Sequence, residues 1–170
     1  MSTRIGAGFV MLSLGLTLTV TMSGAAQKGK GCSQQAWAEF VERLAQAQAA
    51  YVKANPEPMK ALWSHANDVS LFGAYGGHER GWSEVGPRLT WASRTNSDGS
   101  HDHDQVLTTI RGTDLALVTQ LEHITNRRAD GSPAPVQNLR VTHVARCEAS
   151  TWRLVHRQAD PLVETNPPAR

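Results

Sequence analysis

The sequence has no large excess of charge of either sign. Its 170 residues hold 17 lysines and arginines against 15 aspartates and glutamates, a formal net charge of +2 at pH 7. Proteins that bind nucleic acid or anionic membrane surfaces through charge carry a clear basic excess. The composition therefore predicts neither nucleic acid nor a membrane surface as a partner.

Cysteine is nearly absent, and the chain contains only Cys32 and Cys147. In an oxidising compartment the two thiols can form a disulfide that ties the start of the first predicted helix to a late strand. The alternative is two buried, unpaired thiols, because sequence does not give the Cα separation that a bridge requires.

Acidic residues are also absent from residues 1–26, which hold one basic residue, Arg4. Apolar or small residues fill Ile5 to Ala26, and Ser23-Gly24-Ala25-Ala26 offers a cleavage site. This pattern is typical of an export signal, so we expect removal of residues 1–26 and a periplasmic or secreted protein. A membrane anchor of this length is the alternative, but the glycine and threonine content favours cleavage.

Beyond the signal, the pattern predicts one domain over residues 33–160, between a flexible leader (27–32) and a proline-rich tail (161–170). Helical spacing and turn residues predict three helices, the first capped by Ser33, the second over Glu57 to Ser64 and the third opening at Gly81. Strands are expected over Asp68 to Phe72, His103 to Arg111 and Asp114 to Asn126, with a loop over 95–100. Helices first and a strand meander afterwards indicate an α+β fold with helices on one face of an antiparallel sheet.

Two further strands, Arg140 to Cys147 and Trp152 to Ala159, form a predicted hairpin around Glu148 to Thr151. If Cys147 pairs with Trp152, His143 lies opposite His156 and Thr142 opposite Arg157. One face then carries Val141, His143, Ala145, Trp152, Leu154 and His156, and the other carries Arg140, Thr142, Val144, Val155 and Arg157. Arginines beside valines and a threonine, away from the loop, suggest a pocket.

Three segments resemble the nuclear-transport-factor-2-like superfamily, also called SnoaL-like or ketosteroid-isomerase-like. They are LWSHANDVSLFGAYGGHERGW (Leu62 to Trp82), GTDLALV and the terminal RVTHV…WRLVHR. The resemblance covers about Trp37 to Asp160. It implies a cone of three N-terminal helices packed on a curved antiparallel sheet, enclosing a pocket and commonly forming a homodimer through the sheet face.

The catalytic residues of the isomerases have no counterpart here. The general-base aspartate falls near Gly73, the oxyanion tyrosine near Ala47 and the second acid near Thr142. Because proton transfer at carbon needs a base beside a donor, isomerase chemistry of that type is not expected. An isomerase, cyclase or hydrolase with a different set is the alternative function, and its candidate catalytic residues are His156, Glu122 and Asp68. No cofactor is expected.

A closer resemblance is to the association (hub) domain of the calmodulin-dependent kinases, where arginines in the pocket bind small carboxylates. Arg140 matches one of those arginines; a second falls at Glu122 and a third near Ala159, where Arg157 can substitute. Across the connection at 127–136 we expect Glu122 beside Arg140. The resemblance thus implies a small-molecule site, anionic in preference, with candidate ligand-binding residues Arg140, Thr142, Arg157, Glu122, Trp82 and Phe72.

Hydropathy alone supports another arrangement of the sheet. The more apolar side carries Leu115, Leu117, Leu121, Val141, Ala145, Trp152 and Leu154, and if that side is the core, Glu122, Arg140 and Arg157 form a solvated ladder. A dimeric scaffold with a vestigial pocket would then be the third function.

The tract His101-Asp102-His103-Asp104 invites a metal interpretation, but no third ligand is identifiable, so no metal site is predicted.

Overall fold

The computed structural model describes residues 31–128 and 130–163, apart from the side chains of Asn96, Ser97, Asp102 and His103. The helices are α1 (Gln34–Tyr51), α2 (Glu57–Leu62) and α3 (Trp82–Arg94). The strands are β1 (Ser70–Phe72), β2 (His78–Arg80), β3 (Asn96–Arg111), β4 (Leu115–Arg128), β5 (Gln137–Glu148) and β6 (Thr151–Pro161).

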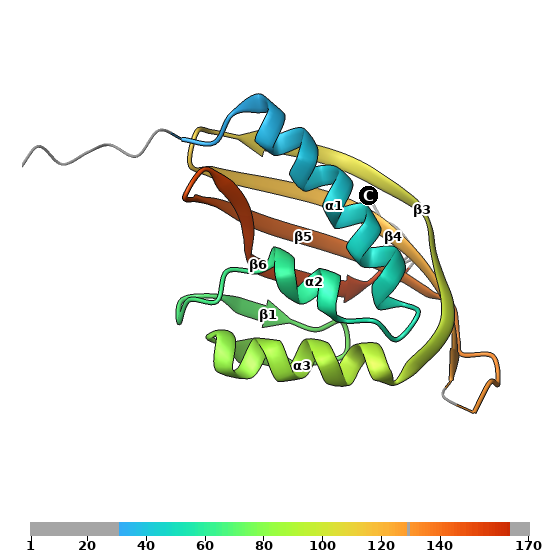
Figure 1. The fold of residues 1–170 in the computed structure, drawn as a ribbon. Helices are drawn as coiled ribbons and strands as arrows, with labels where there is room; N and C mark the ends of the chain where they lie inside the picture. The colour runs from blue at the N-terminus through green and yellow to red at the C-terminus, as the bar shows by residue number, and fades with distance from the viewer. Residues whose placement is uncertain (1–30, 129, 164–170) are drawn as a thin grey trace, which may run out of the picture.

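The strands form one curved, six-stranded sheet in the order β2-β1-β6-β5-β4-β3. The helices lie together on one side of this sheet, as Figure 1 shows, so the predicted α+β architecture is confirmed. One pair departs from the antiparallel expectation, because β1 runs parallel to β6. Strand β2 was not predicted, and β3 begins at Asn96 where the sequence suggested a loop.

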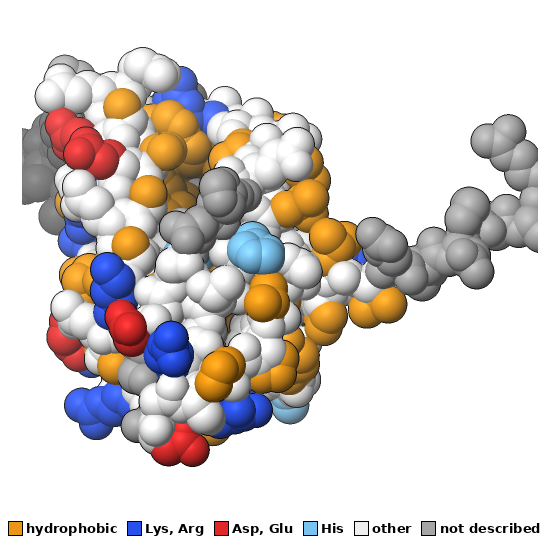
Figure 2. All heavy atoms as spheres, turned by 90° about the vertical axis from the view of Figure 1, so that its right-hand side faces the viewer, with side chains coloured by type: hydrophobic (Ala, Val, Ile, Leu, Met, Phe, Trp, Pro, Cys, Tyr) orange, Lys and Arg blue, Asp and Glu red, His pale blue; other side chains and the backbone are white. Residues whose placement is uncertain are grey.

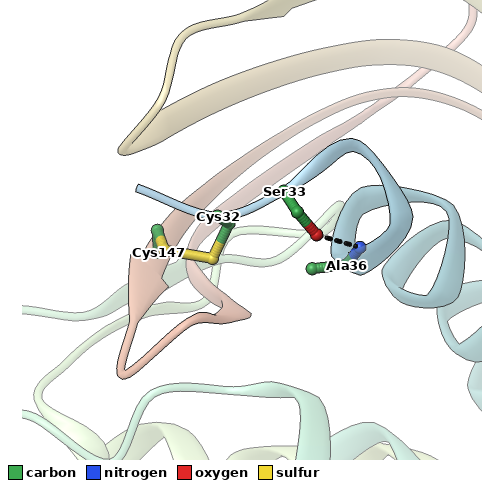
Figure 3. The surroundings of a disulfide bond; sticks show 4 residues. All are labelled: Cys32, Ser33, Ala36 and Cys147. Carbon is green, nitrogen blue, oxygen red and sulfur yellow. Dashed lines mark hydrogen bonds between the residues drawn. A yellow bond between two sulfur atoms is a disulfide. The ribbon is translucent and has the colours of Figure 1, made fainter. Parts of the chain in front are cut away.

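Helix α1 begins as its sequence predicts and is tied to the sheet at its start. The Ser33 side chain accepts a hydrogen bond of 3.0 Å from the backbone N–H of Ala36, which satisfies an otherwise unpaired donor of the first turn (Figure 3). One residue earlier, Cys32 forms a disulfide with Cys147 of β5, with 5.6 Å between the Cα atoms. The structure therefore contains the bridge that the sequence left open.

The β5–β6 hairpin turns through two residues, Ala149 and Ser150, both with positive φ. Two such residues give the turn whose twist matches that of paired strands. Cys147 lies opposite Trp152, as predicted, but the register shifts between Val144 and Ala145. Val155 is the extra residue of this β-bulge.

The bulge overturns the predicted cross-strand pairs. His143 lies opposite Arg157 and not His156, and Thr142 lies opposite Gln158. The connection before β5 also differs by one residue from the expectation, so that Glu122 pairs with Leu139 and Arg140 with Leu121. Because side chains alternate along a strand, each one-residue shift moves a side chain to the opposite face.

The inner face of the sheet, toward the helices, is consequently mixed. Its buried residues are Leu71, Ala116, Val118, Gln120, Glu122, Ile124, Asn126, Leu139, Val141, His143, Ala145, Trp152, Leu154 and Ala159. Its apolar members fall into two clusters. One packs with Trp37, Phe40, Leu44 and Trp63, and consists of Leu71, Ala116, Val118, Ala145, Trp152 and Leu154. The other packs with Val52, and consists of Ile124, Leu139, Val141 and Ala159. The inner face therefore matches neither of the two sides predicted from hydropathy. Glu122, from the predicted polar side, lies on it, and Leu115, from the predicted apolar side, is exposed on the outer face.

The outer face retains several exposed hydrophobic side chains. Leu107, Ile110 and Leu115 are each more than half exposed. Figure 2 shows hydrophobic side chains gathered along its right-hand edge, which corresponds to the back of Figure 1, away from the helices. None of the helices within the described ranges has the length and hydropathy needed to cross a bilayer. The predicted signal at 1–26, most of the leader and residues 164–170 of the tail lie outside the described residues.

Candidate functional site

A cavity of about 390 Å³ lies between the helices and the inner face of the sheet. Its walls are mainly apolar, and a smaller group of polar side chains occupies one part of its lining. The apolar walls include Val52, Met59, Trp63, Leu71, Leu89, Ile124, Leu139 and Ala159. Five polar lining residues form one connected group, Gln48, His101, Glu122, His143 and Arg157, and the others include Tyr51, Arg88, Thr95, Asn126 and Gln137. Apolar walls with a few placed polar groups are the usual composition of a small-molecule site.

Glu122 is the centre of the polar group, and its side chain is fully buried. Arg157 donates to both carboxylate oxygens, at 2.9 Å to Oε1 and 2.8 Å to Oε2. The side-chain amides of Gln48 and Gln120 also donate to Oε1, at 3.0 Å and 2.8 Å. Burial alone would raise the pKa of Glu122, but Arg157 and His101 hold it well below its usual range, so the carboxylate is ionised.

Arg157 is held from two sides and retains unused donors. Its Nη1 also lies 3.1 Å from Nε2 of His143. Because arginine only donates, Nε2 of His143 accepts this bond. The guanidinium has five N–H groups, and the Nε–H and one N–H of Nη2 have no hydrogen-bond partner among the described residues.

His143 is a buried neutral imidazole. Burial, followed by the positive charge of Arg157, lowers the pKa of His143 to about 3. The acceptor role of Nε2 places the ring proton on Nδ1, which is buried with no partner among the described atoms. His143 therefore fixes Arg157 and is a poor proton acceptor near neutral pH.

His101 approaches the same carboxylate from β3. Its Nδ1 lies 3.0 Å from Oδ2 of Asp104, and its Nε2 lies 3.5 Å from Oε2 of Glu122. Burial lowers the pKa of His101, but the hydrogen bonds to Asp104 and Glu122 outweigh burial and raise it to about 9. At neutral pH the imidazolium is therefore charged, with both ring nitrogens engaged by carboxylates.

Of the six predicted ligand-binding residues, the structure brings Glu122, Arg157 and Phe72 to the cavity lining. Arg140 and Thr142 instead line a separate hollow on the outer face, because of the one-residue shift in pairing. The expected Glu122–Arg140 pair does not form, and Arg157 takes the place of Arg140. Trp82 does not line the cavity; its ring stacks on His65 at 3.8 Å between centroids.

The three predicted catalytic residues do not come together. Asp68 is largely exposed and binds Arg146 through both carboxylate oxygens, at 2.7 and 3.1 Å. His156 accepts or donates a 2.8 Å hydrogen bond with Ser70 and contacts the ring of Phe72, on the face opposite to Arg157. Of these three residues, only Glu122 lines the cavity.

Several residues of the cavity lining were not predicted from the sequence. Gln48 was detectable, because it lies four residues after Leu44 on the apolar stripe of α1, where a polar side chain needs a buried partner. Tyr51 is the last residue of the same helix, and its hydroxyl donates to the backbone oxygen of Leu89 at 2.9 Å. Arg88 of α3 carried no distinguishing signal.

Among the described side chains, which include only His101 and Asp104 of the histidine–aspartate tract, no group of three candidate metal ligands is found. His101 and Asp104 instead join the Glu122 network. The side chains of Asp102 and His103 lie outside the described residues.

The chain belongs to the SnoaL-like domain family, because the model of that family matches residues 41–164. Together with the curved sheet and the helices packed on it, this match defines a fold used for small-molecule binding or isomerase-type chemistry. No curated protein matches the sequence.

Solved structures show the same fold. One is a nuclear transport factor 2-like superfamily protein from Salmonella enterica serovar Typhimurium, with a TM-score of 0.66 and 23% identity over 79% of this chain and 94% of that chain. Another is a proposed calcium/calmodulin-dependent protein kinase type II association domain from Thiobacillus denitrificans, with a TM-score of 0.56 and 19% identity over 79% and 98% of the two chains. A third is a proposed dehydratase from Streptomyces avermitilis, with a TM-score of 0.59 and 20% identity over 76% and 96%. At these identities the likeness shows the fold alone.

Proposed function

We propose that this protein binds a small anionic molecule, with a carboxylate as the first candidate, in the cavity beside Arg157. The observation that carries the proposal is the pair of Arg157 N–H groups without a protein partner, in a guanidinium fixed by Glu122 and His143. An arginine that is held in place and has two free N–H groups can donate to both oxygens of a carboxylate.

The charge of the lining supports an anion. The charged lining residues are Arg88, His101, Glu122 and Arg157, and the raised pKa of His101 keeps it positive at neutral pH. Outside the lining, Asp104 pairs with His101 and Glu79 pairs with Arg88. Glu122 already accepts four hydrogen bonds, so the unshared N–H groups of Arg157 are the donors that an entering anion can use. These donors lie in a cavity whose walls are mainly apolar, where a charge-assisted hydrogen bond is stronger than in bulk water.

The alternative function is catalysis. One contact favours it: Nε2 of His101 lies 3.5 Å from the Glu122 carboxylate. A histidine paired with a carboxylate can transfer protons when one ring nitrogen faces the substrate. Here, however, both nitrogens of His101 face carboxylates. Burial also raises the pKa of the Tyr51 phenol, whose proton is donated to Leu89. Binding is therefore the function that we propose first.

Calorimetric titration with a panel of small carboxylates tests the proposal. We expect binding to the wild type, loss of binding in Arg157→Gln, and unchanged binding in the matched control Arg140→Gln on the outer face. Because Arg157→Gln leaves Glu122 buried without its main partner, the double variant Glu122→Gln, Arg157→Gln provides a second test without an unpaired charge. Binding to either Arg157 variant as tight as to the wild type would refute the proposal.

We further propose that the mature protein is exported and acts as a homodimer through the outer sheet face. The Cys32–Cys147 disulfide supports export, because such bridges persist in oxidising compartments. Exposed Leu107, Ile110 and Leu115 support the dimer. N-terminal sequencing of the protein from its native host tests export, and an intact Met1 would contradict it.

A further inference from the structure

The mouth of the cavity carries aromatic side chains that anion binding alone does not explain. Tyr75 is 72% exposed and Trp91 is 58% exposed, the two highest values among the described aromatic residues. Both line this cavity. Trp37, Trp63 and Trp152, by contrast, are buried in the core.

Trp91 faces the mouth because of its place on α3. Arg88, Trp91 and Thr95 follow one another at helical spacing and all line the cavity. The guanidinium of Arg88 lies 4.4 Å from the centre of the Trp91 ring, a cation–π contact. A single face of the helix thus presents a cation and a large ring to the entrance.

Tyr75 approaches the mouth from the loop between β1 and β2. This loop is closed by a hydrogen bond of 2.8 Å from the N–H of Gly73 to the oxygen of Gly77. Arg88 packs against the same loop, so closely that a Cβ on Gly77 would lie 2.7 Å from its Nη2 atom. Arg88 therefore holds the Trp91 ring and the Tyr75 loop in a fixed relation.

The cavity lining therefore combines exposed aromatic rings at the mouth with a buried polar cluster. Between them the lining is mainly apolar, and in the cluster the buried Glu122 and His143 hold Arg157. We infer that the ligand is an aromatic carboxylate whose ring lies against Trp91 and Tyr75 and whose carboxylate binds Arg157. This inference rests on the proposed anion binding and adds that the group attached to the carboxylate is an aromatic ring.

The reason to expect a planar ring is the geometry of aromatic contacts. Offset or edge-to-face ring pairs add stabilisation beyond the area that they bury, equivalent to about 2- to 12-fold in affinity. A saturated ring of equal carbon count buries a similar area without this addition. A preference for the planar ring therefore reports contact with Trp91 or Tyr75.

Calorimetric titration of the full chain with three ligands separates the contribution of the aromatic ring from that of the carboxylate. The ligands are phenylpropanoate, cyclohexylpropanoate and phenylpropanol. We expect phenylpropanoate to bind about 2- to 12-fold more tightly than cyclohexylpropanoate, and phenylpropanol to bind more weakly than either acid. Trp91→Leu should reduce the preference for the planar ring, because only Tyr75 then remains, and Trp91→Phe should restore it. Ile110→Ala on the outer face should leave it unchanged. Because Trp91 is exposed, these substitutions leave the core intact.

The outcomes distinguish this inference from the proposed function. Equal affinities for the two acids, together with unchanged binding in Trp91→Leu, would overturn the aromatic assignment and leave anion binding in place. No binding of either acid to the wild type would overturn both. Equally tight binding of phenylpropanol would overturn the carboxylate assignment. Self-association that Trp91→Leu abolishes would show the mouth to be a contact between copies of the chain, and would also overturn the inference.

Discussion

Replacing Glu122 with glutamine tests the buried network more directly than any other single change. The carboxylate accepts hydrogen bonds from Arg157, Gln48 and Gln120, and His101 lies against its second oxygen. An amide has one acceptor oxygen, so in either orientation its NH₂ group faces donors. Arg157 then keeps its charge without a counter-ion.

The expected loss follows from burial. Breaking a buried ion pair by removing one partner costs about 3–5 kcal/mol. Glu122 is fully buried, but the Arg157 side chain is 19% exposed and can be hydrated from the cavity, so we expect the lower end. A loss of about 3 kcal/mol corresponds to a fall of about 1.5 M in the urea midpoint if the slope is about 2 kcal/mol/M.

Urea unfolding under oxidising conditions, with Arg140→Gln as the control, measures this loss. Arg140 is an exposed arginine of the neighbouring strand, and its replacement should cost less than about 1 kcal/mol. The double variant Glu122→Gln, Arg157→Gln should lose less than the two single variants together, by about 1–3 kcal/mol. A Glu122→Gln loss no larger than that of Arg140→Gln would show that the network does not hold the fold.

Three further predictions concern other parts of the chain. The pKa of His101 is raised from 6.5 to about 9, so its contribution to stability is complete below about pH 6.5 and is lost as the pH rises through 9. The urea midpoint should fall across that window in the wild type and stay flat in His101→Gln; equal slopes would contradict the assigned ion pairs. Reducing Cys32–Cys147, which closes a loop of 115 residues, should cost about 3–5 kcal/mol in urea unfolding, and an unchanged midpoint would speak against the bridge. Leu115→Asp should convert a dimer to a monomer in analytical ultracentrifugation, and a wild-type monomer would remove the proposed interface.

Much of the fold could be predicted because its signals are local. Ser33 and the apolar spacing after it define the start of α1, and the run after Cys147 defines the hairpin loop. The signals that failed were local too. Strand β2 has only three residues, His78 to Arg80, too few to show an alternating pattern.

The site was predicted less well because it depends on register, and register is a relation between distant segments. The sequence predicted both Arg140 and Arg157 beside Glu122, and the structure places Arg157 there. The predicted pair of Glu122 with Arg140 was wrong, because no residue pattern shows how the connection at 127–136 sets the pairing of β4 with β5. The actual pairing, Glu122 with Leu139, turns Arg140 outward.

The bulge at Val155 places the Arg157 side chain on the cavity face of β6. Before it, β6 gives Trp152 and Leu154 to the apolar core; after it, β6 gives Arg157 and Ala159 to the cavity. Without the extra residue, alternation would turn Arg157 outward and leave Glu122 buried with no bidentate partner. Pairing of β6 with β1 begins one residue past the bulge, at His156. The irregularity therefore lies where the strand gains its second neighbour, and it joins an apolar core and a charged cavity on one continuous strand.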